Sequence, residues 1–203
     1  KRTVEDVNAP SAMGIVMNPN TGAVLAMANA PDFDPNQVAK STATIRRNRV
    51  VMDAYEPGST FKVIAASAVL EDGLVNVNDM VNCGWGELHL PNGDVIRDIE
   101  QHGDLTFAEV LQKSSNIGLI KFARLLPRER FYQYMRRFGF ASRTGIGLPA
   151  ENSGLLRNVE DWSERSLETM AIGQEVSVTV LQLAQAYCAI ANGGELMAPR
   201  IVR

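Results

Sequence analysis

The stretch Ser59-Thr60-Phe61-Lys62 decides how the fold of this sequence is interpreted. It follows Glu56-Pro57-Gly58 and opens an apolar run, Val63–Leu70, which predicts a helix from about Ser59 to Asp72-Gly73. The helix is apolar around most of its circumference, so we expect it at the centre of the fold. Residues three positions apart lie on one face of a helix, so the Ser59 hydroxyl and the Lys62 amine should face the same side.

This pair of side chains predicts a serine nucleophile that is activated by a lysine instead of a histidine. A serine hydroxyl is a weak nucleophile until a base lies beside it. Lys62 can be that base if its pKa falls toward neutrality, and burial in an apolar helix disfavours its charged form. The positive end of the helix would stabilise an alkoxide, and the Ser59 N–H could donate to an oxyanion. The spacing alone also fits a simpler arrangement, in which Ser59 caps the helix and Lys62 lies on the surface.

A second polar cluster, Ser114-Ser115-Asn116, interrupts a helical pattern. Thr106-Phe107-Ala108-Glu109 is a capping box that predicts a short helix through Lys113, and the helical pattern resumes over 117–126. The Ser114 hydroxyl could relay a proton, and the Asn116 amide could hold Lys62 and bind a peptide carbonyl. The alternative is a plain polar link between two helices.

The rest of the pattern predicts a single α+β domain over residues 1–203, with helices packed on an antiparallel sheet. A hairpin is expected over residues 12–28, where two nearly continuous apolar runs flank the turn Asn18–Gly22. Such runs favour a sheet that is covered on both faces. A helical subdomain is expected over about residues 104–192. Its further helices are predicted at Arg128–Arg137, Trp162–Ile172 and Val180–Ala191, the last capped by Thr179.

Composition narrows the class of protein. With 203 residues, 45% hydrophobic and 21% charged, the chain is typical of a globular domain with its own core. A net charge of −3 argues against a nucleic-acid binder. Cys83 and Cys188 are expected to be free, partly buried thiols, and with only His89 and His102 beside them a zinc site is not expected. No apolar run approaches the ~20 residues that cross a bilayer, and no signal peptide is evident.

A series of short segments, in a fixed order over nearly the whole chain, matches one enzyme family. These segments are Asn18–Gly22, Val24–Ala28, Phe33–Asn36, Arg47–Arg49, Tyr55–Lys62, Ser114–Asn116, Phe138–Phe140, Thr144–Ile146, Gly173–Gln174 and Thr179–Ala184. With them the chain resembles the penicillin-binding protein transpeptidases, in particular the monofunctional, high-molecular-weight class B enzymes of septation, elongation and sporulation. The resemblance implies the penicillin-binding serine-transpeptidase fold, in which we interpret Gly173-Gln174 as scaffold near the site.

The resemblance also implies a function, that of a serine-type peptidoglycan D,D-transpeptidase. Ser59 would attack the D-alanyl-D-alanine bond of a stem peptide and Lys62 would be its base. Ser114 would pass the proton to the departing D-alanine, and Asn116 would hold the lysine and the substrate amide. β-Lactams would acylate Ser59. No metal or organic cofactor is implied. The implied partners are stem peptides, β-lactams, and a membrane glycosyltransferase with division or elongation proteins, but no nucleic acid, at the extracytoplasmic face of the bacterial cytoplasmic membrane.

The third motif of the family, Lys-Thr-Gly on a strand, is missing. Arg143-Thr144-Gly145 does not replace it, because Ile146–Glu151, directly after it, resembles a different family loop. We therefore expect residues 1–203 to be the front part of a transpeptidase domain, with the C-terminal strands and the membrane anchor outside this chain. The isolated chain is then expected to be weak or inactive.

Three other functions use part of the same pattern. A serine β-lactamase shares the serine–lysine pair but would need a base for deacylation, for which no motif is present. A β-lactam-sensing receptor domain would be acylated and would signal instead of turning over. A scaffold that binds division partners would need no chemistry at all.

Overall fold

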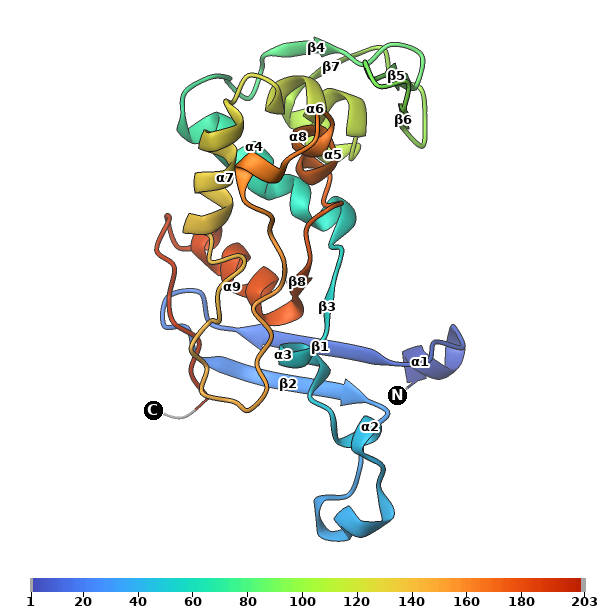
Figure 1. The fold of residues 1–203 in the computed structure, drawn as a ribbon, viewed down its shortest axis with the longest axis vertical. Helices are drawn as coiled ribbons and strands as arrows, with labels where there is room; N and C mark the ends of the chain where they lie inside the picture. The colour runs from blue at the N-terminus through green and yellow to red at the C-terminus, as the bar shows by residue number, and fades with distance from the viewer. Residues whose placement is uncertain (1, 202–203) are drawn as a thin grey trace. The chain divides into compact units, whose positions relative to one another are not determined.

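The computed structural model describes residues 2–201, which divide into two compact units (Figure 1). Unit 1 is formed by the described residues of Lys1–Tyr55, Phe138–Leu155 and Val178–Arg203. Unit 2 is formed by Glu56–Arg137 and Leu156–Ser177. All four predicted site residues therefore lie in unit 2.

The hairpin of unit 1 is formed by β1 (Ala12–Met17) and β2 (Val24–Ala30), which pair antiparallel. In the turn, the Asn18 side chain accepts hydrogen bonds from the N–H groups of Asn20 at 3.0 Å and Thr21 at 3.1 Å. These are the local side-chain to backbone bonds that make asparagine a turn residue. A second short antiparallel pair joins β3 (Ala54–Tyr55) to β8 (Val178–Thr179).

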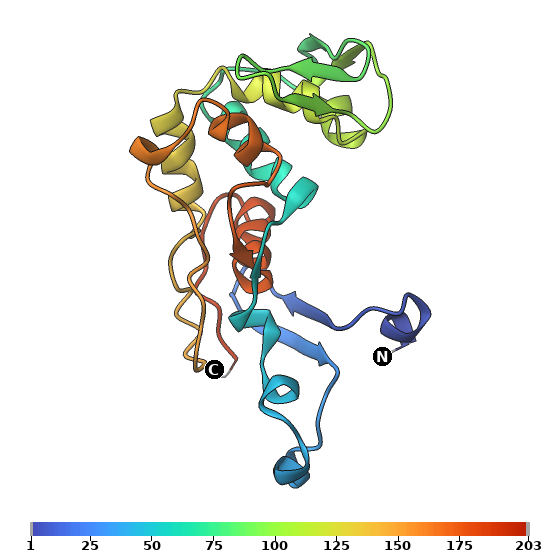
Figure 2. The ribbon, with the colours of Figure 1, turned by 45° about the vertical axis from the view of Figure 1, so that its right-hand side comes forward.

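Helix α9 (Val180–Ala191) packs against β1 and forms the core of unit 1 (Figure 2). The predicted cap at Thr179 is present as a full capping box with Gln182. Leu181 of α9 is buried together with Val50 and Val51 of α3 (Arg49–Met52). The shorter elements of unit 1 are α1 (Arg2–Asp6), η1 (Pro35–Lys40) and α2 (Ala43–Arg46).

The sheet of unit 1 departs from its prediction. Residues of β1 alternate between exposed and half-buried positions: Met13 and Ile15 pack against the core, whereas the side chain of Val16 is 54% exposed. Leu25 of β2 is likewise exposed. Within residues 2–201 the hairpin is thus covered on one face only, because the elements packed on it, α9 and α3, contact the side of Met13 and Ile15.

Unit 2 is built around α4 (Lys62–Glu71), as the sequence predicts. Ile64, Ala65, Ala68 and Val69 of this helix are completely buried. Four helices pack against α4: α5 (Phe107–Gln112), α6 (Asn116–Ala123), α7 (Arg128–Arg137) and α8 (Ser166–Ala171). A helix with apolar side chains all round needs this complete cover, which explains its central place.

Four short strands complete unit 2 at the end where α6 lies (Figure 2). Strand β4 (Met80–Asn82) pairs with β7 (Asp104–Thr106), and β5 (Glu87–His89) pairs with β6 (Val95–Arg97), both antiparallel. Strands β4 and β6 both contact α6. The end of β6 thereby brings the next residue, Asp98, to the first turn of α6.

The prediction of one helix over Trp162–Ile172 was wrong in its first part. A single 3-10 turn, η3 (Val159–Asp161), precedes that range, and α8 begins only at Ser166. The Trp162 indole N–H donates to the Arg157 carbonyl at 3.0 Å, and the Ser163 N–H donates to the Ser166 hydroxyl at 2.9 Å. These local bonds compete with helical ones and delay the start of the helix.

Candidate active site

Ser59 and Lys62 lie at the junction of two helical segments. Ser59 is exposed in the 3-10 turn η2 (Gly58–Phe61), and Lys62 is the first residue of α4, with its N–H donating to the Ser59 carbonyl. The predicted helix from Ser59 is thus a tight 3-10 turn that continues as an α-helix. The Lys62 residue is only 3% exposed, so the surface-lysine interpretation is excluded.

The turn that carries Ser59 is fixed by a close backbone contact between two glycines. Gly58 has a φ of +56°, and its N–H donates to the Gly173 carbonyl at 3.0 Å. Gly173 has a φ of +80°, and a Cβ atom placed on it would lie 2.1 Å from the Gly58 carbonyl oxygen. Only glycine fits there. The segment interpreted as scaffold therefore contacts the residue directly before Ser59.

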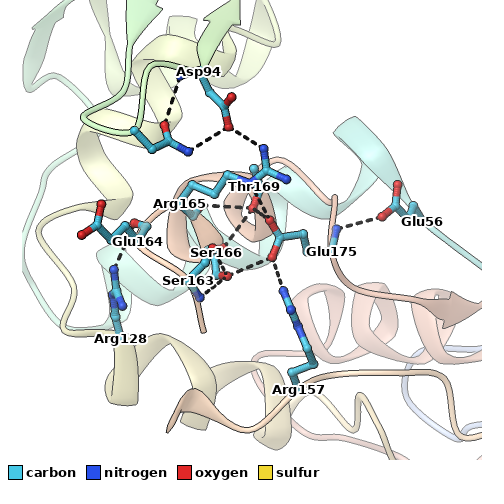
Figure 3. Close-up of polar contacts among 11 residues, drawn as sticks. Glu56, Asp94, Arg128, Arg157, Ser163, Glu164, Arg165, Ser166, Thr169 and Glu175 are labelled. Atoms are coloured by element: carbon cyan, nitrogen blue, oxygen red, sulfur yellow. Dashed lines mark hydrogen bonds and ion pairs between the residues drawn. The ribbon is translucent and has the colours of Figure 1, made fainter. Parts of the chain in front are cut away.

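Glu175 anchors this glycine segment through an extensive polar network (Figure 3). Its carboxylate accepts hydrogen bonds from the hydroxyls of Ser166 and Thr169, both at 2.9 Å, and pairs with Arg157 and Arg165. Burial by itself raises the pKa of the Glu175 carboxyl, but these donors together hold it below its ordinary value. The Glu175 N–H donates to Glu56 at 2.9 Å, three residues before Ser59.

Lys62 contacts the second polar cluster, as predicted, through Ser114. The Lys62 Nζ donates to the Ser114 hydroxyl at 3.0 Å and also to the Ser114 carbonyl oxygen. Ser114 has a φ of +55°, a left-handed conformation that is uncommon outside glycine and is often found at functional sites. The turn between α5 and α6 is therefore held in a special conformation that presents both Ser114 oxygens to the lysine.

Burial lowers the pKa of Lys62 to about 8, and the charge of Asp98 opposes that shift. At about pH 7.4, a group with this pKa is neutral in roughly a fifth of the molecules. An ordinary lysine, by contrast, is almost fully protonated at that pH. Lys62 is thus within reach of the protonation state that a general base requires.

The position of Asn116 corrects one predicted contact. Its amide N–H donates to the Arg97 carbonyl at 2.7 Å, and no hydrogen bond between Asn116 and Lys62 occurs among the described residues. Strand β6 explains this, because the bond to its last carbonyl fixes how the Asn116 side chain is oriented. Asn116 therefore ties the α6 turn to β6, and Ser114 is the residue of this cluster that holds the lysine.

The predicted site residues lie near one another, but none of them bonds to the Ser59 hydroxyl in the described range. Lys62, Ser114 and Asn116 lie on adjoining elements, but the Ser59 hydroxyl makes no hydrogen bond to another residue in the described range. Sequence reasoning missed Asp98, which accepts a hydrogen bond from the Ser115 hydroxyl at 2.6 Å. The two residues are 17 positions apart and belong to no local motif, so no pattern in the sequence indicates their contact.

The described residues offer neither a metal site nor a helix that could cross a membrane. Cys83 is buried and Cys188 is half-buried, and both are free thiols. Within residues 2–201 no group of three or more His, Cys, Asp or Glu side chains could hold a metal ion. No helix in that range combines the length and the apolar character that a membrane crossing requires.

Comparisons with known proteins show the family of the chain. The model of the penicillin binding protein transpeptidase domain matches residues 12–203. The chain is 38% identical to penicillin-binding protein PbpB of Mycolicibacterium smegmatis over 96% of this chain and 30% of that protein. It is 37% identical to the peptidoglycan D,D-transpeptidase FtsI of Escherichia coli K12, over 92% of this chain and 31% of the relative. The chain thus spans about a third of the length of these curated relatives.

Solved structures give the same result for the fold. Penicillin binding protein 3 of Mycobacterium tuberculosis, in complex with aztreonam, aligns with a TM-score of 0.92 and 36% identity over 99% of this chain and 45% of that one. The transpeptidase domain of penicillin-binding protein 3 from Burkholderia pseudomallei aligns with a TM-score of 0.89 and 35% identity, over 100% of this chain and 56% of that one. The chain belongs to the penicillin-binding protein transpeptidase family.

Proposed function

We propose that the protein is a serine-type D,D-transpeptidase that cross-links peptidoglycan stem peptides through an acyl-enzyme on Ser59. One observation carries the proposal: the buried amine of Lys62 contacts the Ser114 hydroxyl, one helical turn from the exposed Ser59. A lysine with a pKa of about 8 in that place has no evident structural purpose, since its burial costs free energy. It is, however, suited to accept a proton from a serine.

Acylation begins with attack of the Ser59 oxygen on the carbonyl carbon of the penultimate D-alanine. The Ser59 proton passes to neutral Lys62, which becomes an ammonium. The tetrahedral intermediate then collapses, the bond from carbon to the nitrogen of the terminal D-alanine breaks, and that nitrogen receives a proton. Ser114 bonds to the Lys62 amine at 3.0 Å, so its hydroxyl is placed to pass the proton from the lysine to the leaving group.

The second half of the reaction transfers the acyl group to a new amine. An amino group of a neighbouring stem peptide attacks the ester carbonyl, the bond to Ser59 breaks, and the serine oxygen regains a proton. Through Ser114, Lys62 serves as base for the incoming amine and then as acid for the serine. Asn116, bonded to the Arg97 carbonyl through its N–H, retains its amide oxygen for the substrate backbone.

The same chemistry implies the partners and the place of action. β-Lactams would hold Ser59 as a stable ester, because ring opening keeps the leaving nitrogen attached near the ester. Penicillin binding protein 3 of Mycobacterium tuberculosis has been solved in complex with aztreonam and in complex with ampicillin, and both structures support this proposal. We place the reaction at the extracytoplasmic face of the bacterial cytoplasmic membrane, where peptidoglycan is cross-linked, beside a glycosyltransferase and division or elongation proteins.

The test uses the protein at its full natural length, with a donor peptide ending in D-alanyl-D-alanine and an amine acceptor. We expect released D-alanine and a cross-linked peptide, and neither product with Ser59→Ala. Release of D-alanine without a cross-linked product would indicate that the enzyme hydrolyses the donor instead of transferring it. Steady turnover of a chromogenic cephalosporin, instead of one stoichiometric burst, would favour a serine β-lactamase. A burst with no reaction on peptides would favour a receptor domain.

A further inference from the structure

Asp98 lies at the first turn of α6 and accepts hydrogen bonds from three donors there. Its Oδ2 accepts from the Ser115 hydroxyl at 2.6 Å, and its Oδ1 accepts from the backbone N–H groups of Asn116 and Ile117, the latter at 3.1 Å. The first N–H groups of a helix have no partners within it, and a carboxylate is the strongest acceptor for them. Asp98 thus caps α6 from the end of a strand, β6, that is distant in the sequence.

Ser115 shares this cap. Its hydroxyl donates to Asp98 and accepts from the Gly118 N–H at 2.9 Å, and Ser115 is 1% exposed. The two side chains together hold the N–H groups of Asn116, Ile117 and Gly118. Ser114, directly before this cap, is thereby fixed in the left-handed conformation that presents its hydroxyl to Lys62.

Asp98 also acts on Lys62 by its charge. Its negative charge favours the ammonium form of the lysine and so opposes the effect of burial. Burial is the larger of the two, and this leaves the pKa of Lys62 at about 8. The carboxylate thus stabilises the cation that appears on Lys62 when it takes the proton of Ser59.

The other ionisable groups around α4 and Asp98 have their own partners. The Cys83 sulfur lies 3.6 Å from the Ser115 hydroxyl. Burial has the largest effect on this thiol and raises its pKa. On α5, Glu109 bonds to Thr106, and on α6, Lys121 bonds to the Asn82 carbonyl. On α7, Arg130 bonds to Asp72, and on α8, Glu168 bonds to Arg124. Lys113, at the end of α5, is exposed and acts on Glu109. Asp98 is therefore the charge that acts on Lys62.

We propose that Asp98 is a positioning residue for acylation: its carboxylate fixes the turn of Ser114 and Asn116 and balances the ammonium that forms on Lys62. This inference rests on the proposed function. The hydrogen bonds of the Asp98 carboxylate go to Ser115, Asn116 and Ile117, so it acts on Lys62 and Ser114 through the α6 turn and its charge. Neither part of this role follows from the three family motifs.

Three variants of the full-length protein separate the two parts of the role. Asp98→Asn keeps the oxygen that can accept from Asn116 and Ile117 but removes the charge. Asp98→Ala removes both. Asp104→Asn is the matched control: it removes one negative charge from β7, where Asp104 accepts from the Asn82 side chain, without touching the α6 turn. The limiting acylation rate and the dissociation constant for a fluorescent penicillin are measured between about pH 5.5 and 9.5, with the melting temperature of each variant.

For Asp98→Asn we expect the lower limb of the pH–rate profile to move to lower pH by about half a unit or more, because the lysine loses its neighbouring anion. For Asp98→Ala we expect the limiting rate on the plateau of the profile to fall about tenfold or more, with little change in the dissociation constant, because a displaced turn misplaces Ser114. Asp104→Asn should keep the original profile. A folded fraction that is constant over this pH range scales the whole profile and leaves its midpoint in place, and the melting temperatures check that each variant stays folded throughout.

An unmoved lower limb in Asp98→Asn overturns the electrostatic part of the inference, whatever rate Asp98→Ala gives. A limiting rate in Asp98→Ala within about twofold of the original overturns the positioning part. If the unaltered protein is not acylated on Ser59 at all, the proposed function fails first. If the unaltered protein is acylated on Ser59 and both Asp98 variants keep its rate and pH profile, only this inference is wrong.

Discussion

The side-chain nitrogen of Lys62 lies 3.0 Å from the hydroxyl oxygen of Ser114, although 52 positions separate the two residues in the sequence. The contact joins the start of α4 to the turn before α6, and α4 and α6 pack against each other. The lysine is therefore buried by the helices of unit 2 and has a single hydroxyl partner. Its basicity follows from that burial.

Replacement of Lys62 by arginine should abolish acylation. A guanidinium stays protonated in proteins and so cannot take the proton of Ser59. We expect the acylation rate with a fluorescent penicillin to fall by about 10² to 10⁴-fold, the usual contribution of a general base. Lys113→Arg is the matched control, since Lys113 is exposed at the end of α5. A Lys62→Arg variant that acylates at a tenth of the original rate or faster would exclude Lys62 as the base.

The unaltered protein should acylate faster as the pH rises toward about 8. Only neutral Lys62 is a base, and its pKa of about 8 means that its neutral fraction grows through that pH and falls about tenfold for each unit below it. Stopped-flow acylation between about pH 6 and 9 measures this limb. A rate that stays constant over this interval would contradict a base with that pKa.

Substitution of Gly173 by alanine should displace the turn that carries Ser59. The added Cβ would lie 2.1 Å from the Gly58 carbonyl oxygen, which is backbone and cannot rotate away. We expect a loss of acylation of tenfold or more and a lower melting temperature. Gly145→Ala is the control, because Gly145 has a similar φ of +81° but no atom within 4 Å of the added Cβ. Equal losses in both variants would assign the effect to backbone strain rather than to the contact with Gly58.

Asp72 should stabilise unit 2 at neutral pH and lose that effect in acid. Its carboxylate accepts three hydrogen bonds from the Arg130 guanidinium of α7, at 2.6, 2.7 and 3.1 Å, and one from the Tyr134 hydroxyl. The Arg130 bond, followed by that of Tyr134, lowers the pKa of Asp72 to about 2. Because this pKa is lower in the folded state, the stabilisation is complete above the ordinary pKa of 3.8 and disappears as the pH falls through about 2.

The measurement for Asp72 is thermal unfolding of the protein and of Asp72→Asn across that range. We expect the variant to melt several degrees lower at about pH 7 and the difference to shrink below about pH 4. Asp79→Asn is a control for the loss of one carboxylate in the loop that follows α4, since within residues 2–201 the Asp79 side chain accepts from the nearby Asn76 N–H alone. A difference between Asp72→Asn and the original protein that does not change with pH would contradict this account.

The local parts of the fold were predictable because their signals lie within a few residues. The capping boxes of Thr106 with Glu109 and of Thr179 with Gln182 occur where the sequence indicates them. Residues 63–70 are apolar on most sides of the helix, and this predicted its central place in the fold. The helix predicted from Trp162 failed because hydrogen bonds of the Trp162 indole and of Ser166 compete with the helical ones, which periodicity does not reveal.

The site was predictable only in part, because only some of its contacts lie within a few residues of each other in the sequence. Ser59 and Lys62 lie within one motif, and Ser114 could be added through family resemblance. Asp98 and the contact between Gly58 and Gly173 depend on residues that the fold brings together from distant segments. The predicted bond from Asn116 to Lys62 does not occur among the described residues, because the bond to the Arg97 carbonyl, placed by β6, orients the Asn116 side chain. Contacts of this kind have no signature in a single sequence.

The most direct test of the central claim is the mass of the peptide that contains Ser59 after the full-length protein reacts with a labelled penicillin. The account predicts one adduct per molecule, located on Ser59 by fragmentation, and none on a Ser59→Ala variant of equal melting temperature. An unmodified Ser59 peptide, or a stable adduct on another residue, would contradict the account.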